Sequence, residues 1–116
     1  MNNIILYDLL PQGIKIIWND YIKRKQLNYF DKQYEKVIYI DRYQLRDLVR
    51  QEFEYIIKTR KEINNVFDNY ILNLLNKKIP EYDKKIINGM KNIIKLINNE
   101  LNKDFDKINN KIKLLK

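Results

Sequence analysis

Two long stripes of apolar residues, separated by a single proline, constrain the fold of this chain more than any other feature. The first stripe consists of Val49, Phe53, Ile56, Ile63, Phe67, Tyr70 and Leu74, with Arg60 in its one gap. The second consists of Ile87, Met90, Ile94, Ile97, Leu101, Phe105, Ile108, Ile112 and Leu115. Steps of three and four residues follow the period of an α-helix and exclude the alternation of a β-strand. Between Leu101 and Phe105 a step of four replaces an expected three, which is a small phase shift.

Pro80 separates two helices that we predict at residues 42–79 and 81–115, with Asp41 and Gln44 as a capping box at the start of the first. Each helix would be about 50–57 Å long, and so short a link makes the two helices antiparallel. The predicted register places Leu74 against Ile87, Phe67 against Ile94, Ile56 against Phe105, Phe53 against Ile108 and Val49 against Ile112. Arg60 falls opposite Leu101, where it could reach Glu100 or Asp104.

Further apolar residues flank both stripes, so the hairpin of residues 41–116 has a wider apolar face than a two-helix seam needs. They are Leu45, Ile57, Val66, Ile71, Ile86 and Ile93. Residues 1–40 could cover this face, and a second copy of the chain is the alternative. We therefore predict an all-α protein with one domain over residues 1–116. Its fold is a long, coiled-coil-like antiparallel hairpin, completed to a three-helix bundle by an N-terminal helix with short extended flanks.

The N-terminal segment has a less regular pattern. Helical spacing links Ile14, Ile17, Trp18, Tyr21 and Ile22, and it continues through Leu27, Phe30 and Tyr34 after a slip in phase. This pattern predicts a helix over about residues 12–35. A β-hairpin of residues 4–7 and 14–18 around a turn at residues 10–13 is the alternative. Residues 37–40 are β-branched or aromatic and predict an extended segment.

The composition removes most catalytic chemistry. The chain has no cysteine and no histidine, it lacks serine, and Thr59 is its one threonine. The usual nucleophiles, the usual general base and the commonest transition-metal ligand are therefore missing. Gly13 and Gly89 are too far apart to form a phosphate-binding loop. We expect a protein that is not an enzyme and that has no cofactor, no metal ion and no small-molecule substrate.

The lengths of the continuous apolar segments bear on where in the cell the protein is found. The longest ones are too short to span a bilayer, and the first residues lack the features of a signal peptide. We therefore expect no membrane contact and a cytoplasmic location. Isoleucine, asparagine, lysine and tyrosine share A/T-rich codons, which indicates a low-GC microbe, a virus or a plasmid as the source. For a virus-encoded protein the cytoplasm would be that of the host cell.

The basic residues suggest a partner. The formal net charge is +8, which favours attraction to polyanions. Arg42, Arg46 and Arg50 recur every four residues and so share one helix face. A second basic cluster, Lys23, Arg24 and Lys25, is flanked by Tyr21 and Tyr29. Cations interleaved with aromatic rings suit single-stranded nucleic acid, whose bases stack on such rings. The lysines after residue 60 are widely spread and predict a solvated surface.

Each of these patterns also has a structural explanation. Arg50 could pair with Glu54, Arg46 could pair with Asp20, Asp31 or Glu35, and the tyrosines could edge the core. Two functions therefore stay open. One is a nucleic-acid-binding module that uses both basic clusters. The other is a protein-interaction module with an acidic partner surface: a helical adaptor, or an inhibitor encoded by a virus or mobile element that docks on a larger, nucleic-acid-handling complex.

Overall fold

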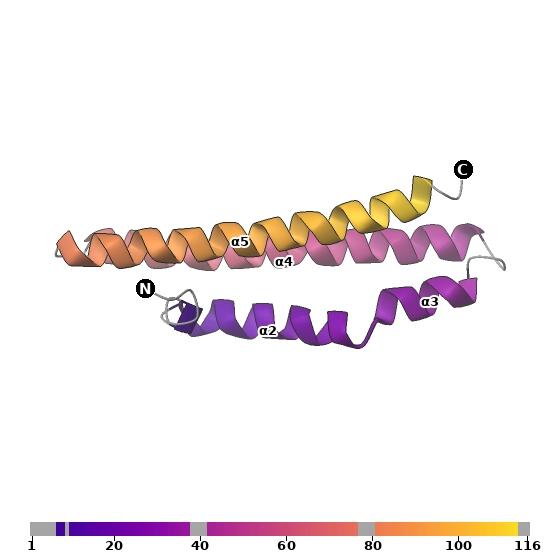
Figure 1. The fold of residues 1–116 in the computed structure, drawn as a ribbon, viewed down its shortest axis with the longest axis horizontal. Coiled ribbons are helices and arrows are strands. Elements are labelled where there is room, and N and C mark those ends of the chain that lie inside the picture. The colour runs from indigo at the N-terminus through magenta and orange to yellow at the C-terminus, as the bar shows by residue number, and fades with distance from the viewer. Residues whose placement is uncertain (1–6, 9, 38–41, 77–80, 114–116) are drawn as a thin grey trace.

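The computed structural model describes residues 7–8, 10–37, 42–76 and 81–113. Its helices are α2 (Gln12–Gln26), α3 (Tyr29–Val37), α4 (Arg42–Asn76) and α5 (Glu81–Lys113). Every regular element among these residues is a helix, as the two stripes predicted. The helices run along a rod that measures 59 × 25 × 22 Å (Figure 1).

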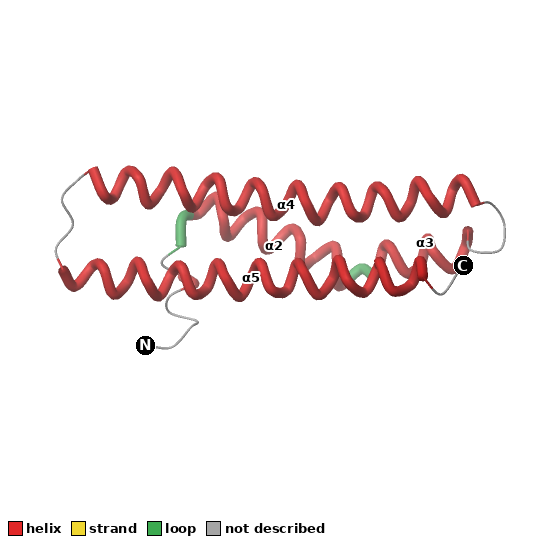
Figure 2. Tube along the Cα trace, turned by 90° about the horizontal axis from the view of Figure 1, so that it is seen from above, coloured by secondary structure: helices red, strands yellow, loops and turns green. Residues whose placement is uncertain are grey.

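The two long helices form the predicted antiparallel hairpin (Figure 2). Ile63 of α4 and Leu101 of α5 are completely buried, near the middle of the two stripes. Asn98 Nδ2 donates a hydrogen bond of 3.1 Å to Asn64 Oδ1 across the seam. The predicted helix ends, residues 77–79 and 114–115, lie outside the described residues, as do the capping residue Asp41 and Pro80. The hairpin therefore exists with the predicted polarity and nearly the predicted length.

The register is close to the predicted one but differs in detail. The ring of Phe53 packs on that of Phe105, with centroids 4.4 Å apart, one turn before the predicted Ile108. The guanidinium of Arg60 donates to Asn102, beside the predicted Leu101. The expected pairing of Arg60 with Glu100 or Asp104 is wrong, because Asn102 lies within reach and the Asp104 carboxylate faces α2.

A third layer covers one side of the hairpin. Helices α2 and α3 run along α4 and α5, bonded to both (Figures 1 and 2). Ile14 and Tyr21 of α2 are buried. Of the flanking apolar residues, Ile93 is buried and most others are half-buried, but Ile57 is 39% exposed and does not face this layer. The third layer is therefore the chain's own N-terminal segment, and the fold is a three-helix bundle.

The N-terminal layer is two helices, which corrects the prediction of one helix over residues 12–35. The chain leaves helical geometry at Leu27 and Asn28, and Asn28 has a φ of 52°. Asparagine tolerates this left-handed region better than most residues. The break coincides with the slip in phase of the apolar pattern. The alternative β-hairpin is wrong, because residues 14–18 are helical; Val37, expected to be extended, ends α3, and residues 38–40 lie outside the described part.

Candidate functional site

The break between α2 and α3 gathers four of the predicted contact residues. Tyr21, Arg24 and Lys25 lie in the last two turns of α2, where a spacing of three to four residues directs them to one side. Tyr29 is the first residue of α3. Each of the four contacts a residue of the hairpin or another of the four at this junction. Residues that are neighbours in the sequence thus form a site together with residues of the other helices.

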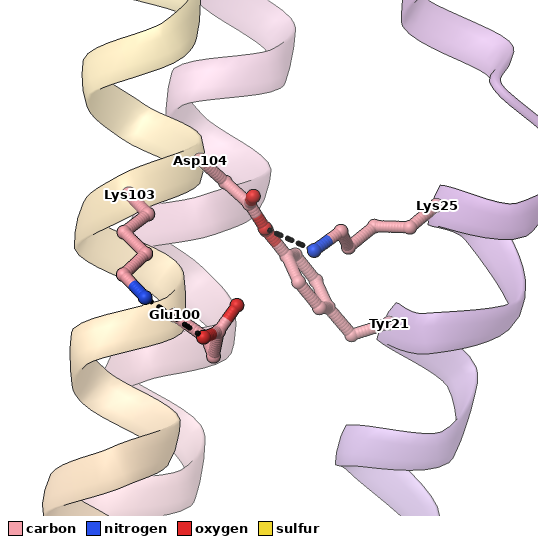
Figure 3. Close-up of polar contacts among 5 residues, drawn as sticks. All are labelled: Tyr21, Lys25, Glu100, Lys103 and Asp104. Atoms are coloured by element: carbon pink, nitrogen blue, oxygen red, sulfur yellow. Dashed lines mark hydrogen bonds and ion pairs between the residues drawn. The ribbon is translucent and has the colours of Figure 1, made fainter.

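A buried carboxylate lies on the inner side of the junction. Tyr21 Oη donates a hydrogen bond of 2.6 Å to Asp104 Oδ2, and Lys25 Nζ lies 3.0 Å from the same oxygen. Figure 3 shows both residues reaching from α2 towards α5, while the Lys103–Glu100 pair lies along α5 itself. A buried charge needs such partners, because burial removes its hydration. Asp104 therefore fastens α2 to α5.

The environment of Tyr21 fixes its protonation state. Burial raises the pKa of this hydroxyl far above its usual value, and the hydrogen bond to Asp104 and the charge of that carboxylate raise the pKa further. A hydroxyl that holds its proton so firmly is a poor acid–base group. Within this cluster Tyr21 therefore acts as a hydrogen-bond donor to Asp104.

A series of ring contacts continues from Tyr21 to the surface. The ring of Tyr21 stacks on Trp18 at 5.2 Å and on Tyr55 of α4 at 5.7 Å between centroids. The guanidinium of Arg24 lies 4.1 Å from the centroid of Tyr55 and 5.1 Å from that of Tyr29. Cation–π attraction and stacking thus link α2, α3 and α4.

Arg24 is also paired with a carboxylate. Its Nη2 donates to Oε2 of Glu52 at 2.7 Å, and both side chains are largely covered. Arg24 is therefore held from two directions, by a charge-assisted hydrogen bond and by two rings. It positions α2 against α4, just as Asp104 positions α2 against α5.

A cavity of about 470 Å³ opens at the junction. Its walls come from all four helices and from Asn28 in the break. Arg24, Lys25, Glu52 and Asp104 line it, together with aromatic residues of α2, α3 and α4. A shallower hollow of about 440 Å³ lies beside it. The junction is therefore a concave site that carries both charged and aromatic groups.

The arginine ladder, defined as Arg42, Arg46 and Arg50, lies in the first turns of α4, and all three side chains are exposed. Arg50 Nη2 is 3.0 Å from Asp47 Oδ1, in a pair whose side chains are 67% and 60% exposed. The expected Arg50–Glu54 pair is therefore wrong, because Asp47 is the nearer partner.

Arg46 likewise does not pair with Asp20, Asp31 or Glu35. Asp31 is bonded instead to Lys111 of α5. Within the part of the chain that the structure describes, neither Arg42 nor Arg46 forms an ion pair. The ion pairs suggested for Arg46 and Arg50 are therefore not formed among the described residues, and the ladder is a solvated row of cations.

The structure divides the predicted contact residues into an exposed and an internal group. Tyr21 is only 2% exposed, so its ring cannot stack on a base, and we remove it from the contact surface. Arg24 is partly covered and Lys25 is exposed, but both are already paired with carboxylates. Lys23 and Tyr29 are exposed, like the arginine ladder. The exposed group is the one that a partner can reach.

Sequence reasoning missed Glu52, Tyr55 and Asp104. Asp104 had a signal: it follows Leu101 by three residues, the position where the second stripe expects an apolar side chain. The apparent phase shift arises because Asp104 and Phe105 both turn inward, Asp104 to α2 and Phe105 to α4. Glu52 and Tyr55 had no comparable signal, because their partners lie on another helix.

The described ranges offer neither a cluster of metal ligands nor a membrane span. They contain no group of three or more acidic side chains that could hold a metal ion. No helix in them is both long and apolar enough to cross a bilayer. No protein-family model, curated protein or solved structure matches this chain. Its function therefore has to be inferred from its own geometry.

Proposed function

We propose that this protein is a non-enzymatic, intracellular nucleic-acid-binding protein that contacts phosphates through the arginine ladder of α4. The observation that supports this most directly is the exposure of Arg42 and Arg46, one turn apart, without an ion pair among the described residues. Successive ladder residues are about 6 Å apart along the helix axis. A rigid row of cations at this spacing suits a partner that repeats its negative charge.

Arg50, the third member of the ladder, can bind a phosphate with little loss of stability. Arg50 and Asp47 are both well exposed, and ion pairs of this kind contribute about 0–1 kcal/mol. A phosphate can therefore replace the Asp47 carboxylate, and a guanidinium suits phosphate because it offers two parallel donors. The net charge of +8 and exposed Lys23 add long-range attraction to any polyanion.

A protein partner is the second candidate. Leu27 is 66% exposed at the α2–α3 break, beside exposed Tyr29. Tyrosine and arginine are enriched at the energetic centres of protein interfaces, and Leu27 adds exposed apolar area beside them. In this version the arginine ladder would meet an acidic protein surface, for example on a nucleic-acid-handling complex.

Fluorescence anisotropy with labelled single-stranded and double-stranded oligonucleotides tests the proposal. The variant Arg42→Gln/Arg46→Gln/Arg50→Gln should bind both more weakly, by about tenfold or more. The matched control Lys61→Gln/Lys84→Gln/Lys95→Gln removes the same charge from exposed lysines that form no ladder. It should retain most of the affinity. Circular dichroism confirms that both variants fold.

The outcomes separate the two candidates. Equal weakening in both variants would show a general charge effect and contradict a role for the ladder. A wild-type protein that binds neither oligonucleotide at moderate salt would contradict the nucleic-acid proposal and leave an acidic protein partner.

A further inference from the structure

We propose that the cavity at the α2–α3 junction binds an unpaired nucleotide, a planar aromatic base joined to a phosphate, and that the protein therefore prefers single strands to duplexes. This inference rests on the proposed function for the source of the nucleotide. It uses residues other than the arginine ladder, so the two can fail separately.

The size and position of the cavity suit a ligand of this class. Its volume of about 470 Å³ lies within the range of roughly 300–1,000 Å³ that is usual for small-ligand pockets. It lies between the helices of a bundle, which is a common place for such pockets. Asn28, in the break between α2 and α3, contributes to its wall.

The charges around the cavity select an anion. Three carboxylates line it, and each is already paired: Asp104 with Lys25, Glu52 with Arg24, and Asp31 with Lys111. A cationic ligand would therefore meet no unpaired carboxylate. Lys107 also lines the cavity, is exposed, and forms no ion pair with another described residue. Its ammonium is the surplus charge that an anionic group can neutralise.

The rings around the cavity select a planar group. Tyr29 and Phe30 of α3 and Tyr55 of α4 contribute to its walls. Tyr29 is 45% exposed, and its ring contacts the guanidinium of Arg24. A base that stacks on Tyr29 would extend the existing series of ring contacts, and such stacking tolerates any base. An aromatic ring that can stack on a base, next to a cation that can pair with a phosphate, suits a nucleotide.

The neighbouring hollow favours a strand over a free nucleotide. The two concavities have similar volumes, about 470 and 440 Å³, and share Arg24, Tyr29 and Tyr55. Tyr29 therefore stands in the wall between them. The second hollow is also lined by Glu54 and by Lys58, whose exposed ion pair with Glu62 contributes little, so a phosphate can compete for this ammonium. A ligand with repeated bases and phosphates matches this arrangement, whereas the bases of a duplex are already stacked and paired.

Two variants test the cavity without altering the ladder. Tyr29→Leu removes an exposed ring but keeps an apolar side chain, and Lys107→Gln removes the surplus cation. Tyr43→Leu and Lys95→Gln are the matched controls, because both residues are exposed and neither lines the cavity. The probes are oligodeoxythymidylate of about eight nucleotides, a duplex and adenosine 5′-monophosphate, followed by anisotropy and by NMR titration.

We expect Tyr29→Leu and Lys107→Gln each to weaken single-strand binding, by about tenfold for the ring. Duplex binding should change much less, and both controls should match wild type. Adenosine 5′-monophosphate should shift NMR signals of cavity residues in the wild type and not in Tyr29→Leu. The triple arginine variant, by contrast, should weaken binding of single strands and duplexes alike.

Unchanged single-strand affinity in both cavity variants would overturn the inference, whatever the ladder does. So would signal shifts confined to residues outside the cavity, or mononucleotide binding without any preference for single strands. Loss of single-strand affinity in the cavity variants, with normal binding by the triple arginine variant, would support the cavity and contradict the ladder.

Discussion

Tyr21 of α2 and Asp104 of α5, 83 positions apart in the chain, are joined by a hydrogen bond of 2.6 Å inside the bundle. Lys25 shares the same carboxylate oxygen, at 3.0 Å. Apolar contacts alone would allow α2 to slide along the groove between the long helices. A buried polar contact penalises such slippage, because it would leave Asp104 without partners. The Tyr21–Asp104 hydrogen bond therefore fixes the position of α2 along the two long helices, and with it the position of the junction cavity.

Removal of the Tyr21 hydroxyl should destabilise the protein. Tyr21→Phe keeps the ring and its stacking but deprives the buried carboxylate of one donor. We expect the free energy of unfolding to fall by about 1–3 kcal/mol, measured by urea denaturation. Tyr29→Phe, at an exposed ring, should change it by less than about 0.5 kcal/mol. Equal, small effects at both positions would mean that the Tyr21–Asp104 bond does not stabilise the fold.

The raised pKa of Tyr21 predicts a dependence of stability on alkaline pH. Below a pH of about 10, tyrosine is protonated in the folded and unfolded states, and the stabilisation is complete. Above it, the unfolded chain loses this proton while folded Tyr21 keeps it, so stability falls by up to about 1.4 kcal/mol per pH unit. The advantage of the wild type over Tyr21→Phe should therefore shrink between about pH 9 and about pH 11. The other titrating groups are common to both proteins. A constant difference in urea denaturation would contradict the assignment.

A substitution in the core of the hairpin should lower the free energy of unfolding more than the loss of the Tyr21 hydroxyl does. Phe67 is 5% exposed in the middle of the first stripe, and Phe67→Ala should lower the free energy of unfolding by about 3–5 kcal/mol. Lys95→Ala, on the solvent face of α5, should stay within about 0.5 kcal/mol. Thermal and urea denaturation give both values. Similar small losses at the two positions would show that the buried face is misassigned.

Crosslinking tests the register and the hairpin together. The chain has no native cysteine, so Asn64→Cys/Asn98→Cys introduces one defined pair at side chains now 3.1 Å apart. A short bifunctional thiol reagent should link the two within one chain, seen as a faster-migrating monomer on a denaturing gel. The control pair Asn64→Cys/Asn110→Cys, far along α5, should not crosslink. Linkage only between chains would indicate a homodimer with an intermolecular seam.

The long helices could be predicted because their determinants are local and repeated. Ile63, Phe67 and Leu101 occupy positions in stripes that no other secondary structure accommodates, and all three are buried. The break in the N-terminal helix was harder to locate. The sequence indicates this break only by a slip in the phase of the apolar pattern. The structure, with α2 and α3 packed on the hairpin, places the break at Asn28.

The junction site could be predicted only in part. Its basic and aromatic residues on α2 form a visible cluster, but Glu52, Tyr55 and Asp104 belong to it through contacts between helices. Arg24 and Lys25 pair with these carboxylates only because α2 packs on the hairpin. The periodicity of the apolar residues does not determine where α2 lies on the hairpin. The arginine ladder differs: a spacing of four on one helix specifies a shared face by itself.

The salt dependence of binding tests the central claim, that the ladder neutralises phosphates, most directly. Each phosphate contact releases condensed counterions, so the logarithm of affinity falls linearly with the logarithm of salt concentration. The triple variant of Arg42, Arg46 and Arg50 to glutamine should give a slope shallower by about 2–3 units than wild type, across a salt series in fluorescence anisotropy. A folded variant with the wild-type slope would contradict the claim.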